Sequence, residues 1–335
     1  MDLVEEFLKR GVLLSPELKQ KIKPEEVESI ADNFKKQDVV LTEDAYSLMK
    51  ISPVKVVYEH KKEGKTRKIT NFVDFYNQRF EFLRELLKKK LELKELASIN
   101  KLGPGDVVVI GMVRDAKKEG FDLEDSTGSV TCISPERVLE DEVIAVKGRF
   151  DRKKIQVEKT IYPDISLSRK VNTTQDDCQV LFTQKNLPSR ELPPYIFTSD
   201  ASIGDLKNVK SWIVTKKGNL PKGERSLGAS PPFMADVMGV KVFVLEYSHM
   251  DEVKKRLETD DEKKIVVELL KRRHFLPFLY LDNDPYLLRE VPDIVFMTGG
   301  KETFFLNYKG VSVVSFSGGG AFMVNLKTRD YREIK

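Results

Sequence analysis

The chain has 335 residues, of which 40% are hydrophobic and 33% charged, and its formal net charge at pH 7 is +4. This composition excludes intrinsic disorder and is typical of a globular protein with about two or three domains. The sequence has no apolar run long enough to cross a bilayer and no signal-peptide core at its start, and so small a positive charge does not by itself indicate a nucleic-acid-binding protein.

The residues that most often bind transition metals are few and scattered. Cys132 and Cys178 lie far apart without metal-binding spacing, which favours reduced thiols in a cytoplasmic protein. The three histidines are His60, His249 and His274, and we expect His249 in a loop and His274 at a helix end. A hydrolase site with two metal ions needs several His, Asp and Asn ligands close together, so this inventory argues against one.

The first 102 residues predict a small helical module and a connecting region. Residues 1–50 carry helix-start signals, such as the Ser-Pro pair at Ser15, and we expect short helices here. Such a module either docks onto a partner or packs on its own chain. Residues 51–102 contain a predicted strand, 54–58, and a long helix, about 72–93, whose apolar side chains recur at helical spacing.

Residues 103–165 predict a small β-barrel. The phrase L-E-D-S-T-G-S-V, from Leu123 to Val130, places a polar turn between two strands. Such a turn within a series of five strands is typical of an OB-fold. The predicted strands are 107–113, 121–124, 129–133, 142–148 and 155–160.

The function of this predicted barrel stays open between two alternatives. OB-folds that bind single strands stack bases on exposed aromatic side chains above a basic groove. The barrel has few aromatic residues, namely Phe121, Phe150 and Tyr162, which favours a protein-binding or scaffold role. The basic clusters at 152–154 and 271–273 are either solvated surfaces or phosphate contacts. The candidates for nucleic-acid contacts are Arg152, Lys153 and Lys154.

Residues 166–335 predict a domain in which strands and helices alternate. Its central stretch is a buried strand, Tyr195 to Phe197, which ends in a polar turn at Asp200. Many hydrolases place a first metal ligand at the end of such a strand, but Ser202 stands where a second ligand, histidine, would follow. The other predicted elements are the strands 212–214, 241–245, 293–297, 303–308, 311–316 and 322–326, a last strand near Tyr331, and a helix at 260–273.

Four late segments carry a family resemblance, namely V-E-L-L-K-R-R-H at 267–274, E-V-P-D-I-V at 290–295, N-Y-K-G-V at 307–311 and V-N-L-K-T at 324–328. With them the chain resembles the small subunit of the archaeal family-D DNA polymerase and, more distantly, the B-subunits of eukaryotic replicative polymerases. The resemblance implies an α+β protein with an N-terminal helical module, an OB-fold β-barrel and a degenerate metallophosphoesterase β-sandwich with flanking helices. The domains expected are 1–50, 51–102, 103–165 and 166–335.

The resemblance also implies that the phosphoesterase site has lost its chemistry. Active members of the family carry D-x-H, G-D, G-N-H, a lone H and G-H-x-H around two metals, and this sequence departs at each motif. Three carboxylates near these positions could hold one hard cation, but three lysines beside them favour internal salt bridges. The residues of this vestigial site are Asp200, Ser202, Lys216, Lys217, Glu246, Gly300, Lys301 and Glu302.

The sequence therefore predicts an inactivated paralogue with no catalytic residue, metal or cofactor. We expect a scaffold or regulatory protein of archaeal DNA replication or repair, whose partner is the C-terminal region of a DNA polymerase large subunit or another replication protein. Three alternatives stay open. They are a single-stranded nucleic-acid-binding protein acting through the OB-fold, a residual 3'-5' exonuclease or phosphodiesterase, and a regulator that competes with an active small subunit.

Overall fold

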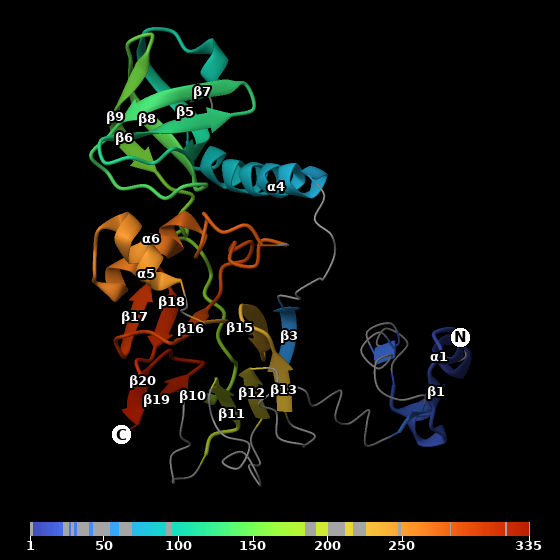
Figure 1. Cartoon of the computed structure of the whole chain (residues 1–335). Helices are drawn as coiled ribbons and strands as arrows, with labels where there is room; N and C mark the ends of the chain where they lie inside the picture. The colour runs from blue at the N-terminus through green and yellow to red at the C-terminus, as the bar shows by residue number, and fades with distance from the viewer. Residues whose placement is uncertain are drawn as a thin grey trace. The chain divides into compact units, whose positions relative to one another are not determined.

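The computed structural model describes residues 3–22, 27, 30–31, 40–42, 54–59, 69–91, 96–184, 192–199, 212–216, 226–246, 249–281, 283–318 and 320–334. The chain divides into two compact units, residues 1–55 and 56–335 (Figure 1). The finer borders expected near residues 102 and 165 stay predictions.

The first unit is built from short elements around a small apolar core. It contains α1 (Leu3–Lys9), β1 (Leu13–Leu14), the 3-10 helix η1 (Pro16–Gln20) and β2 (Val40–Leu41), and β1 pairs with β2 in parallel. The helix predicted at Ser15 is therefore a short 3-10 segment. The other short helices predicted within residues 1–50 lie largely outside the described residues.

The predicted barrel is confirmed. Its elements are β4 (Leu96–Ala97), η4 (Ile99–Lys101), β5 (Gly105–Arg114), β6 (Gly120–Asp125), β7 (Gly128–Ile133), β8 (Val143–Phe150) and β9 (Lys154–Ile161). The strand order β5-β6-β7-β9-β8 closes because β8 also pairs with β5, and β7 runs parallel to β9. This is the five-stranded closed topology of an OB-fold.

Glycine makes the tight strand crossings of the barrel possible. A Cβ atom at Gly120 would lie 2.1 Å from the carbonyl oxygen of Cys132, and one at Gly148 would lie 2.2 Å from that of Gln156. Any other residue at these two positions would push neighbouring strands apart.

The long helix α4 (Ile69–Lys88) covers one side of the barrel. Its buried residues Leu83 and Leu87 pack against Ile110, Met112 and Val143 of β5 and β8. The apolar stripe predicted for this helix thus forms its contact with the barrel, as periodic burial requires.

The C-terminal half builds two six-stranded sheets of mixed direction, and the second sheet also includes one strand from before the barrel. The first sheet consists of β13 (Ser226–Ala229), β12 (Trp212–Lys216), β11 (Tyr195–Thr198), β10 (Gln179–Thr183), β19 (Ala321–Asn325) and β20 (Tyr331–Ile334), in that order. The second consists of β17 (Phe304–Tyr308), β18 (Val311–Ser315), β16 (Ile294–Thr298), β15 (Val240–Glu246), β14 (Phe233–Val237) and β3 (Val54–Glu59).

Aromatic side chains join the two sheets into a sandwich. The ring of Phe182 in β10 lies 5.2 Å from that of Phe296 in β16 and 5.3 Å from that of Phe197 in β11, measured between centroids. On its other face the second sheet is covered by α5 (Met250–Leu257) and α6 (Glu262–Arg272). The predicted fold class, α+β with an OB-fold barrel and a sandwich with flanking helices, is confirmed.

Several elements of this domain were not predicted from the sequence, among them β10, β13, β14 and α5. His249, expected in a loop, takes the N-cap position of α5, although its side chain makes no capping hydrogen bond. Within the described part of the chain, no helix is long and apolar enough to cross a membrane.

Candidate functional site

The carboxyl ends of parallel strands from both sheets meet at one pocket. In the first sheet β11 pairs in parallel with β12, and in the second β15 pairs in parallel with β16. β15 ends at Glu246, directly opposite Thr298 at the end of β16. Ligand sites of α/β proteins commonly lie at this edge of a sheet, so the pocket is the candidate functional site.

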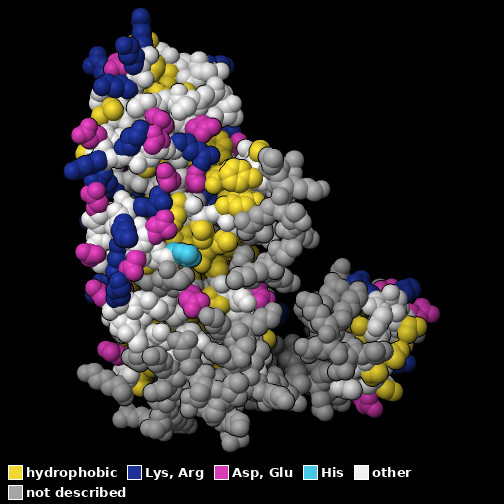
Figure 2. Space-filling model, in the orientation of Figure 1, with side chains coloured by type: hydrophobic (Ala, Val, Ile, Leu, Met, Phe, Trp, Pro, Cys, Tyr) yellow, Lys and Arg dark blue, Asp and Glu magenta, His cyan; other side chains and the backbone are white. Residues whose placement is uncertain are grey.

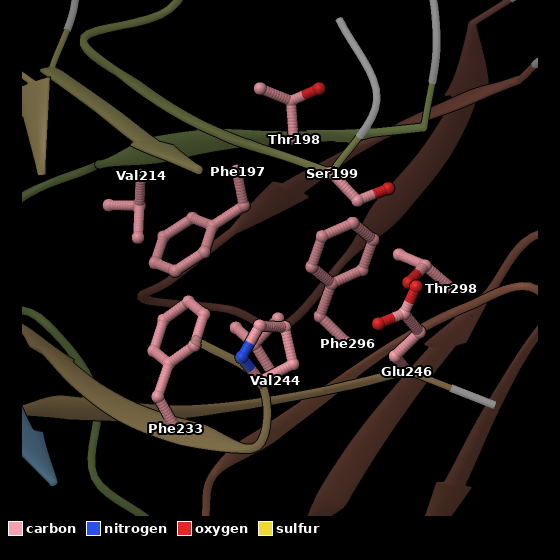
Figure 3. A pocket seen from close by; sticks show the side chains of 10 residues that line it. Phe197, Thr198, Ser199, Val214, Phe233, Val244, Glu246, Phe296 and Thr298 are labelled. Atoms are coloured by element: carbon pink, nitrogen blue, oxygen red, sulfur yellow. The ribbon is translucent and has the colours of Figure 1, made fainter. Parts of the chain in front are cut away.

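The walls of this pocket are mainly apolar. Figure 3 shows three phenyl rings, those of Phe197, Phe233 and Phe296, turned toward one another, with Val214 and Val244 beside them. The enclosed cavity has a volume of about 10 Å³, which is room for about one water molecule. The aromatic packing between the sheets therefore fills most of the space that a ligand would need.

The polar groups lie along one side of the pocket. Ser199, Glu246 and Thr298 stand together there, and Glu246 supplies the only carboxylate among the described lining residues. Hard cations need several oxygen ligands and transition metals need nitrogen or sulfur ligands, so these residues do not fit a centre with two metal ions. Throughout the described ranges, no group of three or more His, Cys, Asp or Glu side chains could hold a metal ion.

The structure places only some of the residues that were predicted for a vestigial site. Glu246 lines the pocket, and Lys216 ends β12. Asp200, Ser202 and Lys217 lie outside the described residues. The remaining three, Gly300, Lys301 and Glu302, follow β16 in one loop.

This loop wraps around a buried carboxylate that sequence analysis did not single out. Glu262, the first residue of α6, is 1% exposed. Its carboxylate accepts hydrogen bonds from the backbone N–H groups of Lys301 and Glu302, at 3.1 and 3.2 Å, and pairs with Lys254 at 2.9 Å. A Cβ atom at Gly300 would lie 3.2 Å from the carboxylate oxygen Oε2 of Glu262, so glycine allows this close approach.

The side chain of Lys301 points to another carboxylate. Its Nζ forms an exposed ion pair with Asp251 of α5 at 2.9 Å, and this partner raises the pKa of Lys301. The loop at the G-H-x-H position is thus held by α5 and α6, through Asp251 and Glu262.

On the barrel, Arg152, Lys153 and Lys154 form the exposed turn between β8 and β9. The aromatic residues noted in the sequence do not form a stacking platform beside them. Phe121 is 2% exposed, and Phe150 packs against the barrel core.

The basic cluster at 271–273 is not a solvated surface, since Arg272 and Arg273 are buried. Arg272 binds Glu142 of the barrel at 2.5 Å and Glu268 at 2.6 Å, and its guanidinium lies 4.5 Å from the ring centroid of Tyr162. Burial raises the pKa of Glu142 to about 7, although Arg272 opposes the shift. This contact joins α6 to the barrel.

A second buried network joins α4 to the C-terminal domain. Arg79 is fully buried and binds both carboxylate oxygens of Asp284, at 2.7 and 2.9 Å. His274 completes the network, with its Nε2 2.8 Å from Asp284. His274 is therefore not a simple helix-end residue. The one available signal was a histidine inside the family-like segment 267–274, and nothing in that segment pointed to a partner.

Hydrogen bonding fixes the protonation state of His274. Its Nδ1 accepts from the backbone N–H of Leu276 at 3.0 Å, so the ring proton sits on Nε2 and is donated to Asp284. Burial lowers the pKa of His274 to about 4, with the Asp284 charge opposing the shift. The pKa of Asp284 is also lowered, because His274 and Arg79 together outweigh its burial.

The fold and site define a class of protein in which an OB-fold barrel is joined to a sandwich of two mixed sheets with a nearly filled pocket. No family model matches the chain. Across 348 residues it is 23% identical to the DNA polymerase II small subunit of Archaeoglobus fulgidus, covering 74% of this chain and 70% of that protein. Over 103 residues it is 33% identical to the DNA polymerase II small subunit of Methanothermobacter thermautotrophicus, covering 24% and 21% of the two chains. The chain is thus homologous to archaeal DNA polymerase II small subunits.

Solved structures give weaker likenesses. An archaeal phosphodiesterase matches 47% of this chain and 98% of its own with 10% identity and a TM-score of 0.29. A Thermotoga maritima protein matches 47% and 97% with 13% identity and a TM-score of 0.25. Neither TM-score is high enough to indicate a shared function.

Proposed function

We propose that this protein is a non-catalytic, small-subunit-like scaffold or regulatory protein of archaeal DNA replication or repair. Its homology to DNA polymerase II small subunits supports an association with replication. Its partner is the C-terminal region of a polymerase large subunit or another replication protein. A protein of this machinery works in the archaeal cytoplasm.

The observation that carries the non-catalytic part of this proposal is the apolar pocket at the strand ends. Phosphodiester hydrolysis by two metal ions requires a cluster of ligands that holds both metals in a shaped cavity. Here phenyl rings occupy the cavity and Glu246 is the only carboxylate among its described lining residues. The loop with Lys301 and Glu302 directs its backbone N–H groups to Glu262.

A nuclease assay tests the proposal that the protein is non-catalytic. Purified protein is incubated with single-stranded and double-stranded DNA, and with a chromogenic phosphodiester, in Mn²⁺, Mg²⁺ or Zn²⁺. We expect no turnover above the background of the Glu246→Ala variant. Hydrolysis by the wild type that Glu246→Ala abolishes would contradict the proposal and restore the residual-phosphodiesterase alternative.

The scaffold part is supported by an exposed aromatic surface at the start of α4. Phe72 and Val73 are 48% and 51% exposed, although both are large and apolar. The ring of Phe72 contacts Tyr76 at 4.8 Å and Tyr280 at 5.2 Å between centroids. Rigid aromatic clusters that stay partly exposed are typical anchors of protein interfaces. This surface adjoins the junction where Arg79 ties α4 to the C-terminal domain.

An affinity pull-down tests the scaffold part. Tagged protein is incubated with lysate of the native cells at moderate and high salt after nuclease treatment, and bound proteins are identified by mass spectrometry. We expect a polymerase large subunit or another replication protein to be retained. The variant Phe72→Ser/Val73→Ser should lose it, whereas Leu167→Ser, at a residue 83% exposed, should keep it. Partners that depend on nucleic acid and disappear at high salt would contradict the scaffold proposal.

In one alternative, this protein is a regulator that competes with an active small subunit for the same large subunit. This alternative differs from the scaffold proposal only in which partner is excluded from the complex. Titrating this protein into a preformed complex of large and active small subunits distinguishes the two. Displacement of the active subunit indicates the regulator, and binding without displacement indicates the platform.

A further inference from the structure

The β8–β9 hairpin of the barrel, residues 147–159, is a basic surface that the proposed scaffold role does not use. Residues 147–159 contain six basic and two acidic residues, an excess of +4 that equals the net charge of the whole chain. All six cations are exposed. They are Lys147, Arg149, Arg152, Lys153, Lys154 and Lys159. Figure 2 shows Lys and Arg side chains gathered at the end of the barrel opposite α4.

Neighbouring carboxylates balance these cations only in part, since Asp106 faces Arg149 across the strands and Asp151 lies near Lys154. Within the described residues, none of the six takes part in an ion pair, in contrast to most basic side chains of α4, α5 and α6. The nearest carboxylate, Asp151, accepts from the backbone N–H groups of Lys153 and Lys154, both at 2.9 Å. It therefore fixes the turn and leaves the two ammonium groups facing water.

The register of the sheet adds a second observation. Lys147 of β8 lies directly opposite Lys159 of β9. Like charges at facing positions of antiparallel strands destabilise a sheet. A bound polyanion would remove this repulsion, because its charges would screen the two ammonium groups.

The described residues of the barrel form no aromatic stacking platform, and this favours a duplex over a single strand as the polyanion. Single-strand-binding OB-folds gain much of their affinity from bases stacked on exposed aromatic rings. Here Phe121 is buried in the barrel, and Tyr162 is covered by the guanidinium of Arg272. Contact must then come from phosphates alone. A duplex carries one phosphate charge per about 1.7 Å of axis, a higher density than a single strand offers.

We propose that the β8–β9 hairpin, residues 147–159, is a sequence-independent binding surface for the phosphate backbone of double-stranded DNA. The surface lies on the barrel and is independent of the pocket at the strand ends and of the aromatic surface on α4. The hairpin holds a duplex without reading its bases.

Fluorescence anisotropy with the full chain tests this inference. The probes are a labelled 20-base-pair DNA duplex and the matching single strand, in 50 to 200 mM salt. We expect the duplex to bind more tightly than the single strand, with no sequence preference and a log–log salt slope of about −4, corresponding to about four phosphate contacts. The variant Lys153→Glu/Lys154→Glu should bind the duplex at least about tenfold more weakly, with a slope shallower by about 2.

Two further variants separate a local site from general charge and from misfolding. Lys255→Glu/Lys264→Glu changes the net charge equally at exposed positions of α5 and α6 and should bind within about twofold of the wild type. Lys147→Gln/Lys159→Gln removes the facing charges, so it should weaken duplex binding while leaving the thermal midpoint equal or higher. Equal losses in the hairpin and helix variants, tighter binding of the single strand, or no duplex binding at 50 mM salt would each overturn the inference.

Discussion

Arg79 is fully buried, and most of its hydrogen-bond partners lie about 200 residues away in sequence. It spans from α4 to Asp284, and its guanidinium also lies 4.6 Å from the ring centroid of Phe75. A buried ion pair adds little net stability when complete, but removing one partner leaves an uncompensated charge in the interior. The cost of breaking this pair should therefore greatly exceed that of breaking an exposed pair on the same helix.

Helix α4 carries both a buried and an exposed ion pair, so the two can be compared on the same helix. We expect Arg79→Met to lower the free energy of unfolding by about 3–5 kcal/mol, because Asp284 stays buried and charged. Arg84→Met, which breaks an exposed pair with Glu81, should cost about 1 kcal/mol or less. Urea unfolding of both variants measures the difference. Similar small losses would mean that Asp284 is adequately stabilised by His274 alone.

The buried imidazole of His274 makes stability depend on pH. Its pKa is about 4 in the folded chain against an ordinary 6.5, so between these values the unfolded chain binds a proton that the folded chain does not. Stability therefore falls as the pH falls from 6.5 to 4, by up to about 1.4 kcal/mol per pH unit from this group. His274→Gln should flatten this part of the curve, measured by urea unfolding at pH 7, 6 and 5. His249→Gln serves as the control, and parallel curves for His274→Gln and wild type would refute the assignment.

At the scale of elements, the start of α6 organises the loop after β16. Asp261 caps the helix by accepting from the backbone N–H of Lys264 at 3.1 Å, and Glu262 then turns inward to bind the loop. A carboxylate at a helix N-terminus also interacts favourably with the helix dipole. One helix end thus fixes a loop that, in the resembling enzymes, holds metal ligands.

Removing this charge should release the loop. We expect Glu262→Gln to cost about 2 kcal/mol of unfolding free energy, because hydrogen bonds to a charged group contribute about 1.5–3 kcal/mol. The amides of Lys301 and Glu302 should exchange with solvent faster in the variant. Glu302→Gln, at an exposed side chain, should leave both stability and exchange nearly unchanged. Unaltered amide exchange in Glu262→Gln would show that other contacts hold the loop.

At the scale of the whole molecule, buried charge joins the barrel to the C-terminal domain. Arg272 and Glu142 come from α6 and from the residue before β8, and their side chains are 1% and 2% exposed. Exposed pairs surround them, including Arg256 with Glu140 and Arg137 with Glu258. The junction is therefore specified by one buried pair and a rim of weak surface pairs.

A double-mutant comparison tests how this junction works. Arg272→Met alone should cost about 3–5 kcal/mol and increase hydrogen exchange at residues 137–143, since Glu142 loses its partner. Adding Glu142→Leu should recover much of the loss, because the interior then holds no unpaired charge. If the double variant is less stable than the single, the two side chains act independently and the coupling is absent.

Much of the fold could be predicted from local pattern. The five barrel strands alternate or carry β-branched runs between clear turns, and α4 shows an apolar stripe, so their signals lie within short segments. α5 was missed because most of its residues are charged, so it gives no strong periodic signal. β10 is as long as β12, which was predicted, but its apolar run at 180–182 lies between polar segments. In the candidate site, Glu246 and the loop at 300–302 could be located from the motifs. Glu262 could not, because its role depends on a contact across 39 positions.

The sequence alone predicted the barrel, because its strands and turns are visible in residue identity and local periodicity. The order of the modules and the departure from the ligand motifs of the resembling enzymes stay predictions. The tertiary structure alone determined which charged side chains are buried and which carboxylates they pair with. Arg79, Arg272 and His274 look like ordinary polar residues of helix surfaces or ends, yet each is buried against a carboxylate of another segment. Burial and pairing arise only when separate segments pack together, since desolvation and Coulomb energy depend on distance in space. For the same reason, only the folded barrel showed that its cations stay exposed and its aromatic rings do not.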